Sequence, residues 1–189
     1  MTAVQTIGRW LTGLSLMMGL LLSLAACLPA GDTGTGGEAG PAHLALEQAI
    51  LELSPEVDPE EAARAARIAV TYPLELRARY GVTDPPLIHN TKVNMGLRSR
   101  GLCWHWADDL EARLAAEGFE SLTLHRAIAN ATSLLIDHST VVISARGATM
   151  EEGIVLDGWR NGGRLYWARV PDDRRYEWER RADVFARRR

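Results

Sequence analysis

The spacing of apolar residues divides the chain into a helical part and a strand part. Between residues 43 and 117, apolar positions recur mainly every three or four residues, which is typical of helices that bury one face. Between residues 119 and 170 they form short runs or alternate with polar positions, which is typical of strands. This order predicts an α+β domain in which helices pack on one face of an antiparallel sheet.

Two helices are predicted before the chain reaches Gly81. Residues 43–53, HLALEQAILEL, form a short amphipathic pattern. Residues 58–61, DPEE, are typical of a helix start, with Asp as N-cap, Pro in the first position and acids in the first turn. Pro73 is expected to end or kink this second helix, although ELRARY can continue it to Gly81.

The third predicted helix begins at a cysteine. Residues 82–101 are rich in proline and glycine and predict an irregular loop that leads to Cys103. The helix then ends near Gly118, a residue suited to the position after a helix. One apolar stripe follows the helical period: Cys103, Trp106, Ala107, Leu110 and Leu114.

Four strands are predicted after this helix, and the chain order makes them an antiparallel meander. Residues 160–163, RNGG, supply turn chemistry between the last two. The strands are FESLTLHRA (119–127), LLIDHSTVVISA (134–145), EGIVLDGW (152–159) and RLYWARV (164–170).

The amino terminus predicts a secreted, lipid-anchored protein. Residues 1–26 combine one basic residue, a short apolar run and small residues, which is the layout of a signal peptide. The motif LAAC, ending at Cys27, resembles the lipobox of bacterial lipoproteins, in which the cysteine is lipidated and becomes the first mature residue. The lipid on Cys27 would be the membrane contact, and Leu28 in place of Asp would suit the periplasmic side of an outer membrane. An ordinary signal peptide with a chance cysteine, or an uncleaved anchor, is the alternative.

Composition completes the domain plan. Residues 27–42 carry too few large apolar side chains to fold and are interpreted as the lipidated cysteine and a flexible tether, which leaves residues 43–189 as one domain. The formal net charge of −3 gives no indication of nucleic-acid binding. Arginines that alternate with acids, and the final ARRR, are interpreted as a solvated surface.

Cysteine usage makes Cys103 the residue of interest. If Cys27 carries lipid, Cys103 has no disulfide partner in a compartment where thiols tend to be oxidised. A helix start lowers the pKa of a thiol and offers free N–H groups to an oxyanion, and Arg98 and Arg100 add positive potential. A buried, inert cysteine is the competing interpretation.

A nucleophilic cysteine needs a base and a group that orients the base. If the connection 146–152 turns near Gly147 and Ala148, His138 lies directly opposite Asp157 in an antiparallel pair. Opposed side chains share a face and can touch. A slip of one residue would move Asp157 to the other face.

Three motifs in this order, GLCWHWADDL (101–110), DHSTVVI (137–143) and VLDGW (155–159), resemble the transglutaminase-like branch of the papain-like cysteine-protease superfamily. The resemblance implies that Cys103 is the nucleophile, His138 the general base and later acid, and Asp157 the orienting carboxylate. It further implies peptidase, amidase or acyltransferase chemistry through a thioester, with no metal and no cofactor. Ser139 stands where members often have an aromatic residue, which leaves the substrate class open.

Other polar and aromatic residues near these motifs have two interpretations each. Asn90 and Asn94 can donate to an oxyanion or simply form turns, and Trp104 and Trp159 can line a substrate groove or fill the core. Two further residues are given structural roles: His105 as a surface or loop-facing group and Asp137 as a strand-edge acid. A metal site from Cys103, His105, His125 and His138 is not expected, because their spacing does not match the usual ligand spacings.

The sequence therefore predicts an envelope lipoprotein that acts as a thiol hydrolase or acyltransferase on a peptide-type amide or isopeptide bond. Its partners would be a peptide or protein substrate and the membrane. A non-catalytic binding lipoprotein that keeps the fold, and a cell-wall peptidase of the NlpC type, are the alternatives.

Overall fold

The structure is a computed structural model that describes residues 39–132 and 137–189. The predicted signal peptide, the predicted lipidation site Cys27 and most of the predicted tether lie outside these residues. The first helix, α1 (Ala39–Leu51), begins four residues before the predicted start at His43. Pro41 falls in its first turn, where a missing N–H removes no helical hydrogen bond.

The second helix, α2 (Pro59–Tyr80), has the predicted start. The Asp58 carboxylate accepts a hydrogen bond from the Glu61 N–H at 2.9 Å. The helix continues through Pro73 and ends at Gly81, which has a left-handed φ of 63°. Leu76 and Tyr80 are buried beyond the proline, so tertiary packing holds this last part of the helix in place.

The predicted irregular loop contains a helix, α3 (Pro86–Asn94), so this part of the prediction is wrong. Pro86 occupies the first helical turn, a position that tolerates proline. Leu87 and Ile88 are exposed, and the apolar pattern therefore does not follow a buried face. The next helix, α4 (Cys103–Ala115), begins at the predicted cysteine.

The four predicted strands are confirmed, with shifted bounds: β1 (Leu122–Ala129), β2 (His138–Ala145), β3 (Ile154–Asn161) and β4 (Arg164–Arg169). A short fifth strand, β5 (Glu179–Arg180), and a terminal helix, α5 (Arg181–Arg187), were not predicted. The sheet has the order β4-β3-β2-β1-β5, and every paired neighbour is antiparallel. Short 3₁₀ turns, η1 (Met150–Glu152) and η2 (Val170–Asp172), connect β2 to β3 and follow β4.

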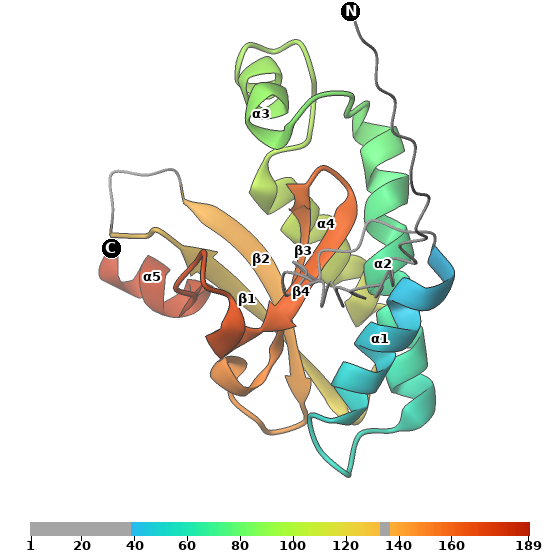
Figure 1. Ribbon diagram of the computed structural model, residues 1–189. Helices are drawn as coiled ribbons and strands as arrows, with labels where there is room; N and C mark the ends of the chain where they lie inside the picture. The colour runs from blue at the N-terminus through green and yellow to red at the C-terminus, as the bar shows by residue number, and fades with distance from the viewer. Residues whose placement is uncertain (1–38, 133–136) are drawn as a thin grey trace, which may run out of the picture. The chain divides into compact units, whose positions relative to one another are not determined.

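The main core lies between the sheet and the layer of α1, α2 and α4, as the α+β prediction required (Figure 1). In Figure 1, α1 and α2 lie side by side at one end of the sheet and α5 lies at the other, beside β1 and β5. The largest fully buried side chains of this core are Leu46, Ile50, Leu110, Leu114, Ile143, Ile154 and Leu156.

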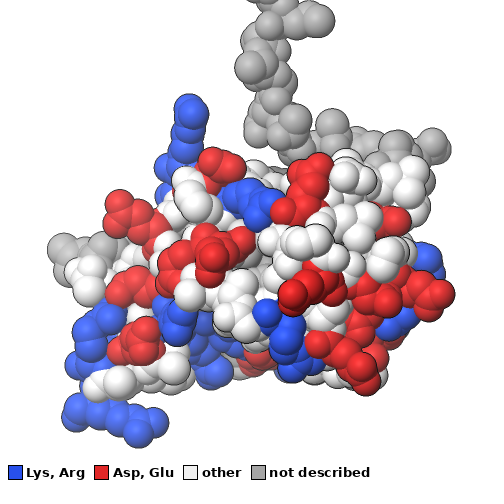
Figure 2. All heavy atoms as spheres, turned by 90° about the horizontal axis from the view of Figure 1, so that it is seen from below, with Lys and Arg blue, Asp and Glu red and all other residues white. Residues whose placement is uncertain are grey.

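The charged surface has no single sign. On the face shown in Figure 2, acidic and basic side chains are intermixed, which agrees with the small net charge of −3. Among the residues that the structure describes, none of the helices has the length and apolarity that crossing a bilayer requires.

Candidate functional site

The loop before Cys103 is fixed by two histidines. Buried His89 meets the Arg100 carbonyl oxygen through its Nε2 at 2.9 Å, and a Cβ on Gly101 would lie 2.3 Å from that nitrogen. Gly101 also has a φ of +125°, a backbone conformation that residues other than glycine rarely adopt. Position 101 therefore requires glycine, and the backbone enters the helix at a set angle.

His105 caps the start of α4 and faces the loop, one of the two roles predicted for it. Its Nδ1 accepts hydrogen bonds from the N–H groups of Gly101 at 3.2 Å and Leu102 at 3.1 Å. Burial and the nearby Arg100 lower the pKa of His105, which keeps the ring neutral and able to accept. The N–H groups of Cys103 and Trp104 take part in none of the hydrogen bonds among the described residues, as is usual for the first turn of a helix.

The Cys103 thiol is buried where α4 begins. The residue is 7% exposed and packs with Trp106, Trp159 and the end of α2. Its Sγ donates to the carbonyl oxygen of Asp137 at 3.5 Å, which brings the thiol to the residue before His138. Arg100, which was predicted to add positive potential, forms an ion pair with Asp109 at 2.7 Å.

His138 and Asp157 are brought together as the sequence predicted, in a register two residues from the predicted one. Val141 pairs with Leu156, whereas the predicted register would pair it with Ile154. A shift by an even number keeps both side chains on one face. The His138 Nε2 lies 2.6 Å from the Asp157 Oδ2, and both residues are buried.

The electrostatics of this pair favour a charged imidazole. Burial alone would lower the pKa of His138, but the charge and hydrogen bond of Asp157, followed by the Cys103 side chain, raise it to about 9. Because Nε2 is taken by Asp157, Nδ1 is the ring nitrogen left for the thiol. This Nδ1 is buried and makes no hydrogen bond with the described residues.

Asp157 is itself held in a buried network. Its Oδ1 accepts from the N–H groups of Trp159 at 3.0 Å and Arg160 at 2.9 Å, and its Oδ2 accepts from the Arg160 guanidinium at 3.1 Å. Burial alone would raise the pKa of Asp157, but His138 and Arg160 outweigh it and lower that pKa. Arg160 continues the network to Asp173 at 2.6 Å.

Three aromatic rings surround His138. The ring centres of Trp159, Tyr176 and Trp178 lie 4.8, 4.7 and 5.4 Å from that of His138. The Trp178 indole also donates to Asp173 at 3.0 Å. These rings exclude water from the imidazole and restrict its rotation. Sequence reasoning missed Tyr176 and Trp178, since neither belongs to a periodic apolar pattern.

A cavity of about 310 Å³ opens beside Cys103. Trp104, predicted as a groove residue, lines it and is 47% exposed. Phe185 of α5 and Arg188, the residue after that helix, also line it. Arg188 donates two hydrogen bonds, of 2.6 and 3.0 Å, to the Asp137 carboxylate, and the residue is exposed, as predicted for the terminal arginines.

Two predicted ligand-binding residues lie elsewhere. Asn94 is exposed at the end of α3, and Asn90 is buried with its Oδ1 accepting from the Trp159 indole at 3.1 Å. That bond gives Asn90 a supporting role for Trp159, which itself packs on His138 and does not line the cavity. Within residues 39–132 and 137–189, no three metal-ligating side chains converge.

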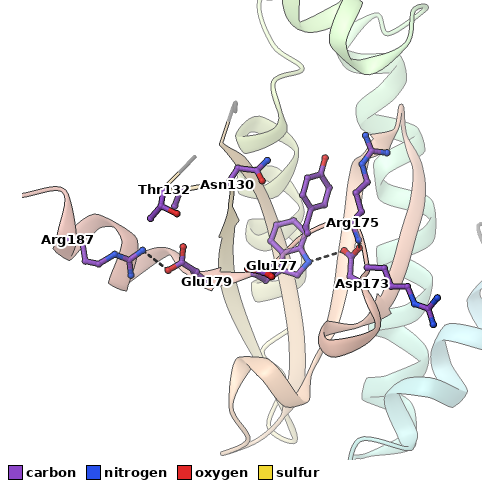
Figure 3. Close-up of a pocket in the computed structure, with 11 residues that line it drawn as sticks. Asn130, Thr132, Asp173, Arg175, Glu177, Glu179 and Arg187 are labelled. Carbon is purple, nitrogen blue, oxygen red and sulfur yellow. Dashed lines mark hydrogen bonds and ion pairs between the residues drawn. The ribbon is translucent and has the colours of Figure 1, made fainter. Parts of the chain in front are cut away.

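A second, larger cavity of about 980 Å³ is lined by residues 130–132 and 173–179 (Figure 3). It shares Tyr176 and Trp178 with the surroundings of His138 and does not include Cys103. Part of its polar lining is internally paired: in Figure 3, Arg187 reaches Glu179, at 2.6 Å.

Comparison with known proteins adds no family: no family model matches the chain, and no curated protein or solved structure matches it. The resemblance to transglutaminase-like enzymes therefore stays a prediction from the sequence, and the case for a function depends on the geometry of Cys103, His138 and Asp157.

Proposed function

We propose that this protein is a thiol hydrolase or acyltransferase that attacks a peptide-type amide or isopeptide bond through Cys103, His138 and Asp157. The observation that carries the proposal is the buried 2.6 Å contact between His138 Nε2 and Asp157 Oδ2, beside a cysteine at a helix start. A base that is oriented by a carboxylate and leaves its other nitrogen for the thiol has the arrangement that nucleophilic catalysis needs.

The reaction would begin from an ion pair, in which His138 Nδ1 already holds the proton that Cys103 Sγ has given up. The thiolate attacks the substrate carbonyl carbon, forming a C–S bond and an oxyanion. The open N–H groups of Cys103 and Trp104 are suited to bind that oxygen. As the intermediate collapses, the C–N bond breaks, the amine leaves with the proton from His138 Nδ1, and a thioester remains.

Water or a second amine would then release the acyl group. His138 takes a proton from the incoming nucleophile, which attacks the thioester carbonyl, and the proton returns to the departing sulfur. Throughout the cycle, Asp157 keeps Nε2 protonated and stabilises the imidazolium. The backbone N–H groups of Trp159 and Arg160 hold that carboxylate in place.

Location forms part of the proposal. The amino-terminal pattern with Cys27 supports a lipid-anchored protein of the bacterial envelope, and an envelope location favours peptide substrates. Cell-wall stem peptides are one such class, and hydrolysis of purified muropeptides would identify the NlpC-type alternative.

The test is the rate at which iodoacetamide alkylates Cys103 at pH 7, read by mass spectrometry of the peptide that contains it. We expect His138→Ala to lower the rate at least about tenfold, because the imidazolium no longer stabilises the thiolate. His125→Ala is the matched control, since His125 contacts Ser144 and does not line the Cys103 cavity. Equal rates in the wild type and His138→Ala would favour an inert cysteine in a binding protein.

A further inference from the structure

The cavity beside Cys103 has an apolar part. Trp104, Ile128 and Phe185 line it, from α4, β1 and α5 respectively. Trp104 and Phe185 are 47% and 39% exposed, so both rings offer apolar surface to the cavity. These surfaces would cover the hydrocarbon portion of an acyl group attached to the cysteine.

Two of the three arginines that line the cavity have acidic partners. Arg126 forms ion pairs with Asp108 and, at 3.2 Å, with Glu111. Arg188 pairs with Asp137 at 2.6 Å. Their charges are therefore largely used within the protein and offer little attraction to a ligand.

Arg181 differs from these two. It lines the same cavity, and no carboxylate lies within ion-pair distance of it among the described residues. Its guanidinium carbon lies 4.7 Å from the centre of the Phe185 ring, which orients the group without neutralising it. Guanidinium forms planar, two-point hydrogen bonds with carboxylates.

We propose that the acyl group accepted by Cys103 carries a carboxylate, which Arg181 binds while the neighbouring rings cover the carbon chain. This inference deepens the proposed function and rests on it. A volume of about 310 Å³ is at the lower end for ligand pockets and fits one amino-acid residue. A glutamyl or aspartyl group has the required aliphatic stem and terminal charge.

Two bromoacetyl probes of equal size separate charge from shape. N-bromoacetyl-glutamic acid α-amide and N-bromoacetyl-glutamine α-amide differ only in the side-chain carboxylate. Each alkylates Cys103 by forming a thioether bond to the CH₂ carbon as bromide leaves. The rates are measured on the full-length protein at pH 7 by mass spectrometry of the peptide that contains Cys103.

We expect the glutamate probe to react about tenfold faster than the glutamine probe, because an unpaired cation raises the local concentration of an anion. Arg181→Gln should bring the ratio close to one, whereas Arg67→Gln, an equal charge change on the exposed surface of α2, should leave it unchanged. In the wild type, 1 M salt should also reduce the ratio. Equal rates in the wild type, or a preference that survives Arg181→Gln, would overturn the inference.

The ratio is independent of the intrinsic reactivity of the thiol, so the two proposals can fail separately. Slow alkylation by both probes that His138→Ala leaves unchanged would reject the enzyme. A ratio near one with a fast, His138-dependent thiol would reject only the acidic acyl group.

Discussion

Replacing Asp157 by Asn removes a buried negative charge with almost no change of shape. Asp157 has two cationic neighbours, His138 at 2.6 Å and Arg160 at 3.1 Å, and Arg160 keeps a second acid in Asp173. His138 loses its main counter-charge. Burial, which disfavours the imidazolium, then prevails, and we expect the pKa of His138 to fall from about 9 to below its ordinary value of 6.5.

The magnitude follows from the pKa of His138 in the wild type. A rise from 6.5 to about 9 corresponds to about 3 kcal/mol, at about 1.4 kcal/mol for each pKa unit. Because the pKa is raised in the folded state, this stabilisation is complete below pH 6.5 and is lost as the pH rises through about 9. The Asp157→Asn variant should not lose this stabilisation as the pH rises.

The assay is urea unfolding of both proteins at pH 6 and pH 10, with the His138 ring titration followed by NMR. The free energy of unfolding of the wild type should fall by about 3 kcal/mol more than that of Asp157→Asn between these pH values. Groups that titrate equally in both proteins cancel in this difference. The reasoning is refuted if both proteins lose the same free energy, or if His138 titrates near 6.5 in the wild type.

Two further predictions concern the loop before Cys103 and the amino terminus. Gly101→Ala should lower the free energy of unfolding by about 3 kcal/mol, from a left-handed backbone and a clash with His89. Gly96 has a φ of +75° and open space around it, so Gly96→Ala should lower the free energy of unfolding by only about 1 kcal/mol. Equal losses for the two variants, measured by urea unfolding, would contradict the clash between residue 101 and His89. Bacteria that express the protein and are fed labelled palmitate should incorporate the label into the wild type and not into Cys27→Ser. Incorporation into Cys27→Ser would exclude lipidation at that cysteine.

Local patterns predicted the elements that carry the candidate triad. The helical stripe placed Cys103 at a helix start, and alternation placed His138 and Asp157 on one face. The predicted register between β2 and β3 was wrong because the connection contains η1, with Met150 buried. This extra turn lies on the β3 side of the connection and shifts the pairing. The register differs from the predicted one by two residues, and a shift by an even number leaves His138 and Asp157 on the same face, where they still make contact.

Long-range contacts supplied what local patterns did not. Tyr176 and Trp178 contact His138 because the chain returns after η2 to pair with β1 through β5. No local sequence pattern predicts this return. Helices α3 and α5 were missed for another reason: their apolar side chains are largely exposed, so neither shows a buried stripe.

The residues of the proposed triad and the residues of α5 that line the cavity beside Cys103 differ in how deeply they are buried. His138 and Asp157 are buried within the sheet, whereas Val184 is the buried residue of α5, and Phe185 is 39% exposed. Substitutions at exposed positions usually change stability by less than about 0.5 kcal/mol. Under the proposed function, substitutions on α5 would alter the acyl preference while Cys103, His138 and Asp157 stay in place, so that substrate choice and chemistry would vary separately.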